Sequence, residues 1–268
     1  MYFLFDIGGT KMRFSSSVDG VNIDGIEIVD TPVLFDKALA QISLMYDKFS
    51  KMGSIDKISG GIAGIFDKER RILLDSYNLP DWKNRNISQI FTDKFKCRIN
   101  LDNDAALEGL GEAVYGVGKG YKIVAYLTVG TGLGGARIVD GAIDVRNTGF
   151  EPGHQIMDTT NLTDLGDLVS GGGFKIRFGV DARRVTDGKI WAENERILAI
   201  GIHNTIVHWS PEIVILGGGL IEEEKYKIEN LNNLLLKLSK NYPYPANIVK
   251  SSLGDKAGLL GALHMARI

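Results

Sequence analysis

Asp6-Ile7-Gly8-Gly9-Thr10-Lys11 decides how the chain begins. It lies between an apolar stretch at residues 2–5 and a second strand-like stretch at residues 12–16. Glycine tolerates the backbone dihedrals that tight turns require, so the pattern predicts a β-hairpin whose tip is glycine-rich and polar. Asp19-Gly20 adds a further turn signal.

The same order of features returns in the second half of the chain. An apolar stretch at residues 123–129 leads into Gly130-Thr131-Gly132-Leu133-Gly134-Gly135, then a strand at 136–139 and a turn at Asp140-Gly141. A repeat of this kind predicts two related domains around a cleft. Chance recurrence of a strand, a glycine turn and a strand is the competing explanation.

Hydrophobic periodicity predicts the remaining elements. Apolar residues at three- and four-residue intervals indicate a helix over residues 35–52. We also expect strands at 58–62 and 212–216, helices at 87–95, 104–114 and 190–209, a mostly helical stretch at 222–240 and a small-residue helix at 257–266.

Composition excludes several protein classes. The 268 residues include 31 Lys and Arg and 33 Asp and Glu, a formal net charge of −2, so nothing favours nucleic acid or an anionic membrane. The single cysteine, Cys97, excludes an intrachain disulfide. The apolar start ends at Asp6 and lacks a basic region, so no signal peptide is expected, and no apolar run approaches the roughly 20 residues of a membrane span. We expect a soluble cytoplasmic protein whose partner is a small molecule or another subunit, which leaves a homodimer open.

The two glycine turns predict phosphate binding. Gly130-x-Gly132-x-x-Gly135 matches the dinucleotide fingerprint, but a strand rather than a helix follows it, and no P-loop motif occurs. For either turn alone, a tight hairpin is the better explanation. Together they could clamp one polyphosphate through backbone N–H groups, with hydroxyl and ammonium donors from Thr10, Lys11 and Thr131. Asp6, beside the first turn, is placed to hold Mg²⁺ through water.

Asn103-Asp104 follows a short strand and opens a predicted helix. Asp104 could serve only as an N-cap. An aspartate with a pKa of about 3.9 is also ionised at neutral pH, and phosphoryl transfer needs a carboxylate that accepts the proton of the attacking hydroxyl. Asn103 could bridge two sugar hydroxyls.

Two further segments could bind a ligand, one through polar side chains and the other through glycine backbone. Glu151 and His154 lie three residues apart in a Gly/Pro-constrained loop, a pairing that suits vicinal sugar hydroxyls, although a lone loop histidine is more often structural. Gly217-Gly218-Gly219 ends a buried strand, where an adenosine could lie against the backbone.

These motifs, in this order, resemble the ROK family of sugar kinases, of the actin-like ATPase superfamily. The resemblance rests on residues 6–11, Gly61-Ile62-Ala63-Gly64, Asn78-Leu79-Pro80-Asp81-Trp82, Asn103-Asp104, residues 128–135, Glu151-x-Gly-His154 and residues 216–219. It implies a duplicated, two-domain α/β fold (actin-like, ribonuclease H-like) with an interdomain cleft. We expect one domain over residues 1–108, joined by the C-terminal helix at 255–268, and another over 109–254.

The resemblance also implies an enzyme: ATP- and Mg²⁺-dependent phosphorylation of a hexose or hexose derivative, often on the 6-hydroxyl, with Asp104 as general base. The implied sugar-binding residues are Gly64, Asn78, Asn103, Glu151, His154 and Asp167. The implied nucleotide-binding residues are Asp6, Gly8, Gly9, Thr10, Lys11, Thr131, Gly132, Gly134, Gly217, Gly218 and Gly219.

Two departures from the family pattern concern the sugar side. Many members carry a cysteine-rich zinc loop after Glu-x-Gly-His, but residues 155–170 contain no cysteine, so no zinc is expected. Gly166 stands where the family has a sugar-binding Glu, so Asp167 or Asp164 could replace it and glucose cannot be assumed as the sugar.

Alternatives within the superfamily stay open. The family includes sugar-sensing repressors, but these add an N-terminal helix-turn-helix, for which a phosphate loop at residue 6 leaves no room. Other sugar specificities, such as N-acetylmannosamine kinase or fructokinase, fit the same motifs. A general actin-like ATPase gives no reason for Asn103-Asp104 and Glu151-x-Gly-His154 to occur together.

Overall fold

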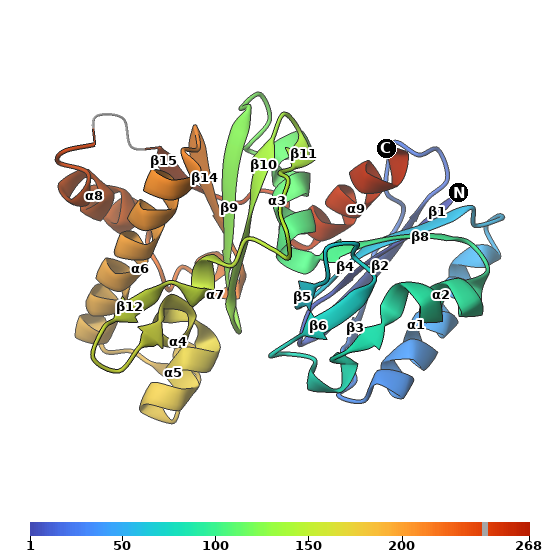
Figure 1. The fold of residues 1–268 in the computed structure, drawn as a ribbon, viewed down its shortest axis with the longest axis horizontal. Helices are drawn as coiled ribbons and strands as arrows, with labels where there is room; N and C mark the ends of the chain where they lie inside the picture. Colours follow the sequence, from blue (N-terminus) through green and yellow to red (C-terminus); the bar gives the residue numbers. More distant parts are fainter. Residues whose placement is uncertain (243–245) are drawn as a thin grey trace. The chain divides into compact units, whose positions relative to one another are not determined.

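Two five-stranded sheets organise the chain, one in each of two units of the computed structural model, which describes residues 1–242 and 246–268 (Figure 1). Unit 1 comprises Met1–Tyr115, Val145–Gly149 and Asp255–Ile268, and unit 2 comprises Gly116–Asp144 and Phe150–Gly254. A boundary after residue 108 would fall inside the continuous helix α3 (Asp104–Tyr115).

The sheet of unit 1 has the strand order β3-β2-β1-β4-β8. Its strands are β1 (Tyr2–Ile7), β2 (Lys11–Ser17), β3 (Glu27–Asp30), β4 (Lys57–Ile62) and β8 (Arg98–Asn103). β1, β4 and β8 are parallel, whereas β2 pairs antiparallel with both β1 and β3. The predicted opening hairpin is confirmed.

Helices cover both faces of this sheet (Figure 1). α1 (Phe35–Ser50) and α2 (Ile87–Phe95) share a buried cluster with Phe3 and Phe5 of β1. α3 and α9 (Ala257–Arg267) pack on the opposite face and on each other. A Cβ atom on Gly261 would stand 1.9 Å from the Leu107 carbonyl oxygen, so the predicted small-residue helix at the C-terminus is confirmed as a close-packing one.

A small second sheet in unit 1 positions Asn78. It consists of β5 (Ile65–Phe66), β6 (Ile72–Asp75) and β7 (Arg85–Asn86), with a 3₁₀ turn, η1 (Pro80–Trp82), after β6. Leu79 and Trp82 are buried, and Asp81 accepts a hydrogen bond from the backbone N–H of Phe35 (2.7 Å), at the start of α1. Leu79, Asp81 and Trp82 therefore act in folding, and together they fix the segment that carries Asn78.

The sheet of unit 2 repeats the topology of unit 1 with the order β11-β10-β9-β14-β15. Its strands are β9 (Ile123–Val129), β10 (Leu133–Val139), β11 (Ala142–Ile143), β14 (Ile213–Gly217) and β15 (Asn247–Lys250). β9, β14 and β15 are parallel, and β10 is antiparallel to β9 and β11. Equal order and equal strand directions show that the repeat in the sequence is a structural duplication.

The second glycine turn is shorter than the sequence predicted. β10 begins at Leu133, so Gly134 and Gly135 belong to the strand and pair with Thr128 and Leu127 of β9. A Cβ atom on Gly135 would stand 2.8 Å from the ring of Pro152, so this glycine serves close packing rather than the turn.

The other elements of unit 2 follow β11 and β14 along the chain. Along the chain, six short elements lie between β11 and α6: η2 (Pro152–His154), β12 (Ile156–Asp158), β13 (Thr163–Asp164), α4 (Leu165–Val169), α5 (Gly171–Phe178) and η3 (Ala182–Arg184). The long helix α6 (Gly188–Trp209) packs on α8 (Ile228–Leu238), and α7 (Gly219–Glu222) follows β14. Residues 222–240, predicted as mostly helical, contain the end of α7 and all of α8. No helix in the described part of the chain is both long and apolar enough to cross a membrane.

Candidate functional site

Three parallel strands of unit 1 end in register. Ile7, Ile62 and Asn103 are neighbours across β1, β4 and β8. Because the carboxyl ends of parallel strands share one sheet edge, the turn after β1, the loop after β4 and the start of α3 are brought together there. The sequence motifs of the first half thus converge on one edge of one sheet.

Asn103 is fixed by both ends of its side-chain amide. Its Oδ1 accepts from the backbone N–H of Ala106 (3.0 Å), and its Nδ2 donates to the carbonyl oxygen of Gly64 (2.9 Å). Asn103 therefore caps α3 and ties it to the loop after β4. One lone pair and one N–H of the amide are left for a ligand.

Asp104 stands at the first position of α3, with its Oδ1 accepting from the N–H of Ala105 (2.9 Å). Because the neighbouring asparagine caps the helix, capping alone does not account for an aspartate here. A Cβ atom on Gly61 would stand 2.9 Å from the Asp104 Cα, so glycine at position 61 lets the start of α3 approach β4.

Asp6 is a buried carboxyl of this edge with a strongly raised pKa. Burial is the largest cause and raises its pKa, the attraction of Arg13 lowers it and the nearby charge of Asp104 raises it, with a net pKa of about 7. Its Oδ2 lies 3.3 Å from Nη1 of Arg13, whereas its buried Oδ1 has no hydrogen-bond partner. An orphaned carboxylate oxygen beside a second carboxylate fits a nearby cation, which would lower the cost of ionising Asp6.

The first glycine turn packs against Asn78. The N–H of Gly8 donates to the Lys11 carbonyl (3.0 Å), and a Cβ atom on Gly9 would stand 2.5 Å from the Asn78 Cβ. Thr10 is exposed at the tip. Lys11 pairs with Asp30 of β3 (2.6 Å), so it would have to exchange this exposed partner to reach a phosphate.

In unit 2 the second glycine turn is fixed on the start of α5. The N–H of Gly130 donates to the Gly132 carbonyl (2.9 Å), and the N–H groups of Gly171 and Gly172 donate to the carbonyls of Gly130 and Thr131 (both 2.8 Å). Sequence reasoning did not connect these two segments. The available signal was Ser170, which caps α5 by accepting from the N–H of Gly173 (3.2 Å) and so marks a helix start.

Gly217-Gly218-Gly219 lies beside this turn. Gly218 has a φ of +91°, and a Cβ atom there would stand 2.6 Å from the backbone N and O of Val129, at the end of β9. Gly217 is the last residue of β14, and Gly219 opens α7. Two of the predicted nucleotide-binding segments therefore meet at the carboxyl edge of the second sheet.

Glu151 and His154 flank the short turn η2. A Cβ atom on Gly153 would stand 2.3 Å from the Leu133 carbonyl oxygen, which explains a glycine between them and seats η2 on β10. Burial raises the pKa of Glu151, and His154 acts in the opposite direction. His154 Nδ1 lies 3.0 Å from Oδ2 of Asp164.

Asp164 and Asp167, the two candidates for a third sugar contact, differ in their surroundings. Asp164 Oδ1 accepts from the N–H of Asp167 (2.8 Å) and caps α4, while its Oδ2 faces His154. The side chain of Asp167 is exposed. Of the two carboxylates, the one that contacts the Glu-x-Gly-His motif is Asp164.

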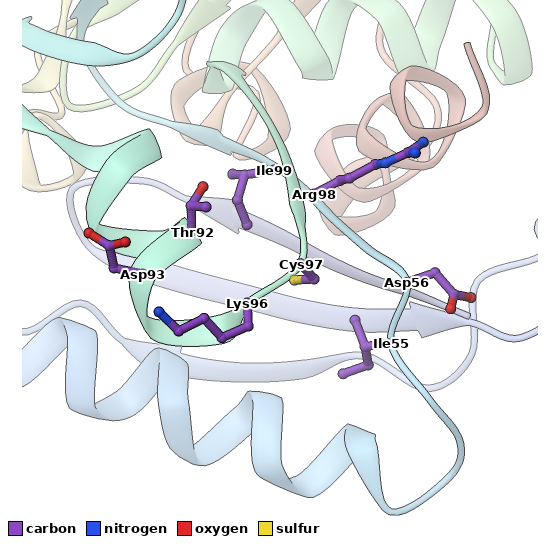
Figure 2. A pocket seen from close by; sticks show the side chains of 8 residues that line it. All are labelled: Ile55, Asp56, Thr92, Asp93, Lys96, Cys97, Arg98 and Ile99. Carbon is purple, nitrogen blue, oxygen red and sulfur yellow. The ribbon is translucent and has the colours of Figure 1, made fainter.

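A groove of about 660 Å³ lies elsewhere in unit 1 (Figure 2). Its lining comes from the segments that enter β4 and β8 and from the end of α2, including Asp56, Thr92, Cys97 and Arg98. These are the amino ends of the parallel strands, at the sheet edge opposite the one that gathers Asp6 and Asn103. None of the predicted site residues lines it.

Comparison with known proteins agrees with this geometry. The model of the ROK family matches residues 2–173 and 182–268. An N-acetyl-D-glucosamine kinase from Photobacterium profundum is 28% identical, over 98% of each chain. The ROK hexokinase from Thermus thermophilus superposes with a TM-score of 0.81 at 24% identity, over 97% of this chain and 96% of that one.

A ROK family glucokinase from Streptomyces griseus, in complex with glucose and AMPPNP, superposes with a TM-score of 0.79 at 22% identity over 99% of each chain. These neighbours and the repeated topology confirm the predicted duplicated α/β fold of the actin-like class. Within residues 1–242 and 246–268, no three His, Cys, Asp or Glu side chains gather as a metal site. With a family model that spans nearly all of its length, the chain belongs to the ROK family.

Proposed function

We propose that this chain is an ATP-dependent kinase that phosphorylates a hexose or hexose derivative, on its 6-hydroxyl. The observation that carries the proposal is the sheet edge of unit 1, where Asp104 opens α3 within electrostatic reach of the buried Asp6. The similarity to an N-acetyl-D-glucosamine kinase supports the reaction class.

In the proposed reaction, Asp104 is the general base. The sugar hydroxyl gives its proton to the Asp104 carboxylate while its oxygen bonds to the γ-phosphorus of ATP, and the bond from that phosphorus to the β-phosphate oxygen breaks to release ADP. The fixed amide of Asn103 holds the start of α3 and offers its remaining donor and acceptor to the sugar. Positioning of this kind supplies much of the acceleration of phosphoryl transfer.

Asp6 would hold Mg²⁺ through water, and the ion would neutralise charge on the transferring phosphates when bound. The first turn of unit 1, residues 8–11, would contact phosphate. In unit 2 the matching roles fall to Thr131, Gly132 and Gly134, with Gly217, Gly218 and Gly219 against the adenosine. The sugar contacts would come from Gly64, Asn78, Asn103, Glu151 and His154, with Asp167 as the further contact expected from the sequence.

A coupled assay of ADP release tests the proposal. Glucose, mannose, fructose, N-acetylmannosamine and N-acetylglucosamine are compared as acceptors, with Asp104→Asn as the test variant and Asp93→Asn, an exposed residue of α2, as the matched control. We expect one or more sugars to stimulate ADP release, with Asp104→Asn losing roughly 10²- to 10⁴-fold and the control keeping the parent rate.

Two results would contradict the assignment. If a sugar binds but no sugar stimulates ADP release, the chain is a sugar-binding regulator of the family rather than a kinase. If Asp104→Asn turns over like the parent, another group is the base.

A further inference from the structure

The contact between His154 and Asp164 joins two adjacent segments of unit 2. His154 ends η2, and Asp164 ends β13 and precedes α4. The His154 side chain is 66% exposed and so open to a ligand, whereas that of Asp164 is 21% exposed. The carboxylate is thus the better-anchored member of the pair.

Three hydrogen-bonding features hold Asp164 in place. Its Oδ1 caps α4 through the N–H of Asp167, and its backbone pairs with Ile156 in the short β12–β13 ladder. The next residue, Leu165, donates its N–H to the Gln155 carbonyl (2.8 Å). The remaining oxygen, Oδ2, points to His154. The backbone around Asp164 is hydrogen-bonded to Gln155 and Ile156, the two residues that follow this histidine.

A carboxylate only accepts hydrogen bonds, so the ring nitrogen that faces it must donate. At 3.0 Å this requires a proton on Nδ1 of His154. In the neutral ring Nε2 then carries no proton and is an acceptor. We propose that Asp164 is a positioning residue that fixes the Nδ1-protonated tautomer of His154 and presents Nε2 as an acceptor for a hydroxyl group of the sugar.

Glycine at position 166 leaves room for this arrangement. A Cβ atom on Gly166 would stand 3.4 Å from the Gly153 carbonyl oxygen and 3.5 Å from Oδ1 of Asp164. A longer side chain at position 166 would begin between the capping oxygen of Asp164 and the turn η2 that carries His154. Asp164, rather than Asp167, is thus the aspartate coupled to the sugar motif, and it acts through His154.

This inference deepens the proposed kinase function and rests on it for the identity of the ligand. The tautomer itself is measurable without activity. The chain has four histidines, so ¹⁵N imidazole shifts, at a pH of about 8.5 where an ordinary histidine is neutral, can be assigned by comparison with His154→Gln. We expect the parent to show the Nδ1-protonated form at His154.

Asp164→Asn is the informative variant. Asparagine is as good an N-cap as aspartate, so α4 keeps its cap. The group that faces His154 then becomes an NH₂ donor, which favours the proton on Nε2 and removes the acceptor offered to the sugar. We expect an inverted tautomer and a KM for the sugar raised roughly tenfold to hundredfold, with an unchanged KM for ATP.

Asp93→Asn is the matched control, because it makes the same substitution at an exposed residue of α2 outside the proposed site, and it should leave both readouts unchanged. A parent protein with the proton on Nε2, or an Asp164→Asn protein with parental tautomer and sugar KM, overturns the inference. Absence of sugar-stimulated ADP release instead contradicts the kinase assignment, and leaves the tautomer measurement valid.

Discussion

Gly258 of α9 faces Asp6. Replacing Gly258 with alanine tests whether close packing of α9 on β1 holds the Asp6 carboxylate in position. A Cβ atom on Gly258 would stand 2.7 Å from the Asp6 Cγ and 3.1 Å from its Oδ1. Asp6 lies inside β1, paired on both sides by β2 and β4, and its carboxylate is buried beside Arg13. The carboxylate of Asp6 therefore has little freedom to move away from an added methyl group.

The expected cost follows from this overlap. The distance to Cγ is about 0.7 Å short of the 3.4 Å at which ordinary contacts begin. Overpacking of this size typically costs ~1–3 kcal/mol. Alanine recovers ~1 kcal/mol of helix propensity over glycine, so Gly258→Ala should lower the free energy of unfolding by up to ~2 kcal/mol. Displacement of a catalytic group by ~1 Å can also lower turnover by ~10²-fold.

Gly188→Ala is the matched control, because Gly188 opens α6 and nothing lies within 4 Å of the Cβ position there. Urea unfolding of both variants separates the overlap from helix propensity, and Mg²⁺ titration of sugar-dependent ADP release reports on Asp6. We expect Gly258→Ala alone to lose stability and to need more Mg²⁺. If it unfolds like Gly188→Ala, the packing argument is refuted, and if it is destabilised with parental Mg²⁺ dependence, Asp6 does not hold the ion.

Three further predictions concern single positions. The pKa of Asp6 is about 7 in the folded state, against 3.8 for an ordinary aspartate. Between these two pH values the folded state keeps the proton and the unfolded state releases it. The free energy of unfolding should therefore fall by up to ~4 kcal/mol as pH rises from 3.8 to 7 in Mg²⁺-free buffer. Asp6→Asn should lack this dependence in urea unfolding at a series of pH values and should lose kinase activity; an identical pH profile would contradict it. Asn103→Ala removes the cap of α3 and the bond to Gly64, and should lower the free energy of unfolding by ~1–2 kcal/mol, whereas a neutral effect in urea would show that neither bond matters. Gly218→Ala introduces a Cβ atom 2.6 Å from the Val129 backbone at a φ of +91°, so we expect ATP binding measured by calorimetry to weaken at least tenfold; parental affinity would place the nucleotide elsewhere.

The pair Asn103-Asp104 shows what the sequence predicts and what only the structure decides. The sequence placed Asp104 at a helix start and left open whether it was only a cap. The structure assigns the cap to Asn103, through a bond to the N–H of Ala106 that depends on side-chain orientation. Spacing along a chain determines where a helix begins, but orientation is determined by what packs around it.

The second glycine turn gives the opposite lesson. Gly130 to Gly135 looked like one turn because glycine permits turns, and yet Gly134 and Gly135 are strand residues. Glycine is also selected where another backbone or ring approaches closely, as Pro152 does at Gly135. The sequence cannot separate these two uses because both require only the absence of a side chain.

The sequence by itself determined the repeated opening of strand, glycine turn and strand in each half, and the family, because these depend on local periodicity and on motifs of fixed spacing. Tertiary structure alone decided which residues meet: Gly258 of the last helix against Asp6 of the first strand, and Asp164 rather than Asp167 on His154. Contacts between residues distant in sequence, and the choice between two nearby carboxylates, depend on packing and side-chain direction, which only the folded chain defines.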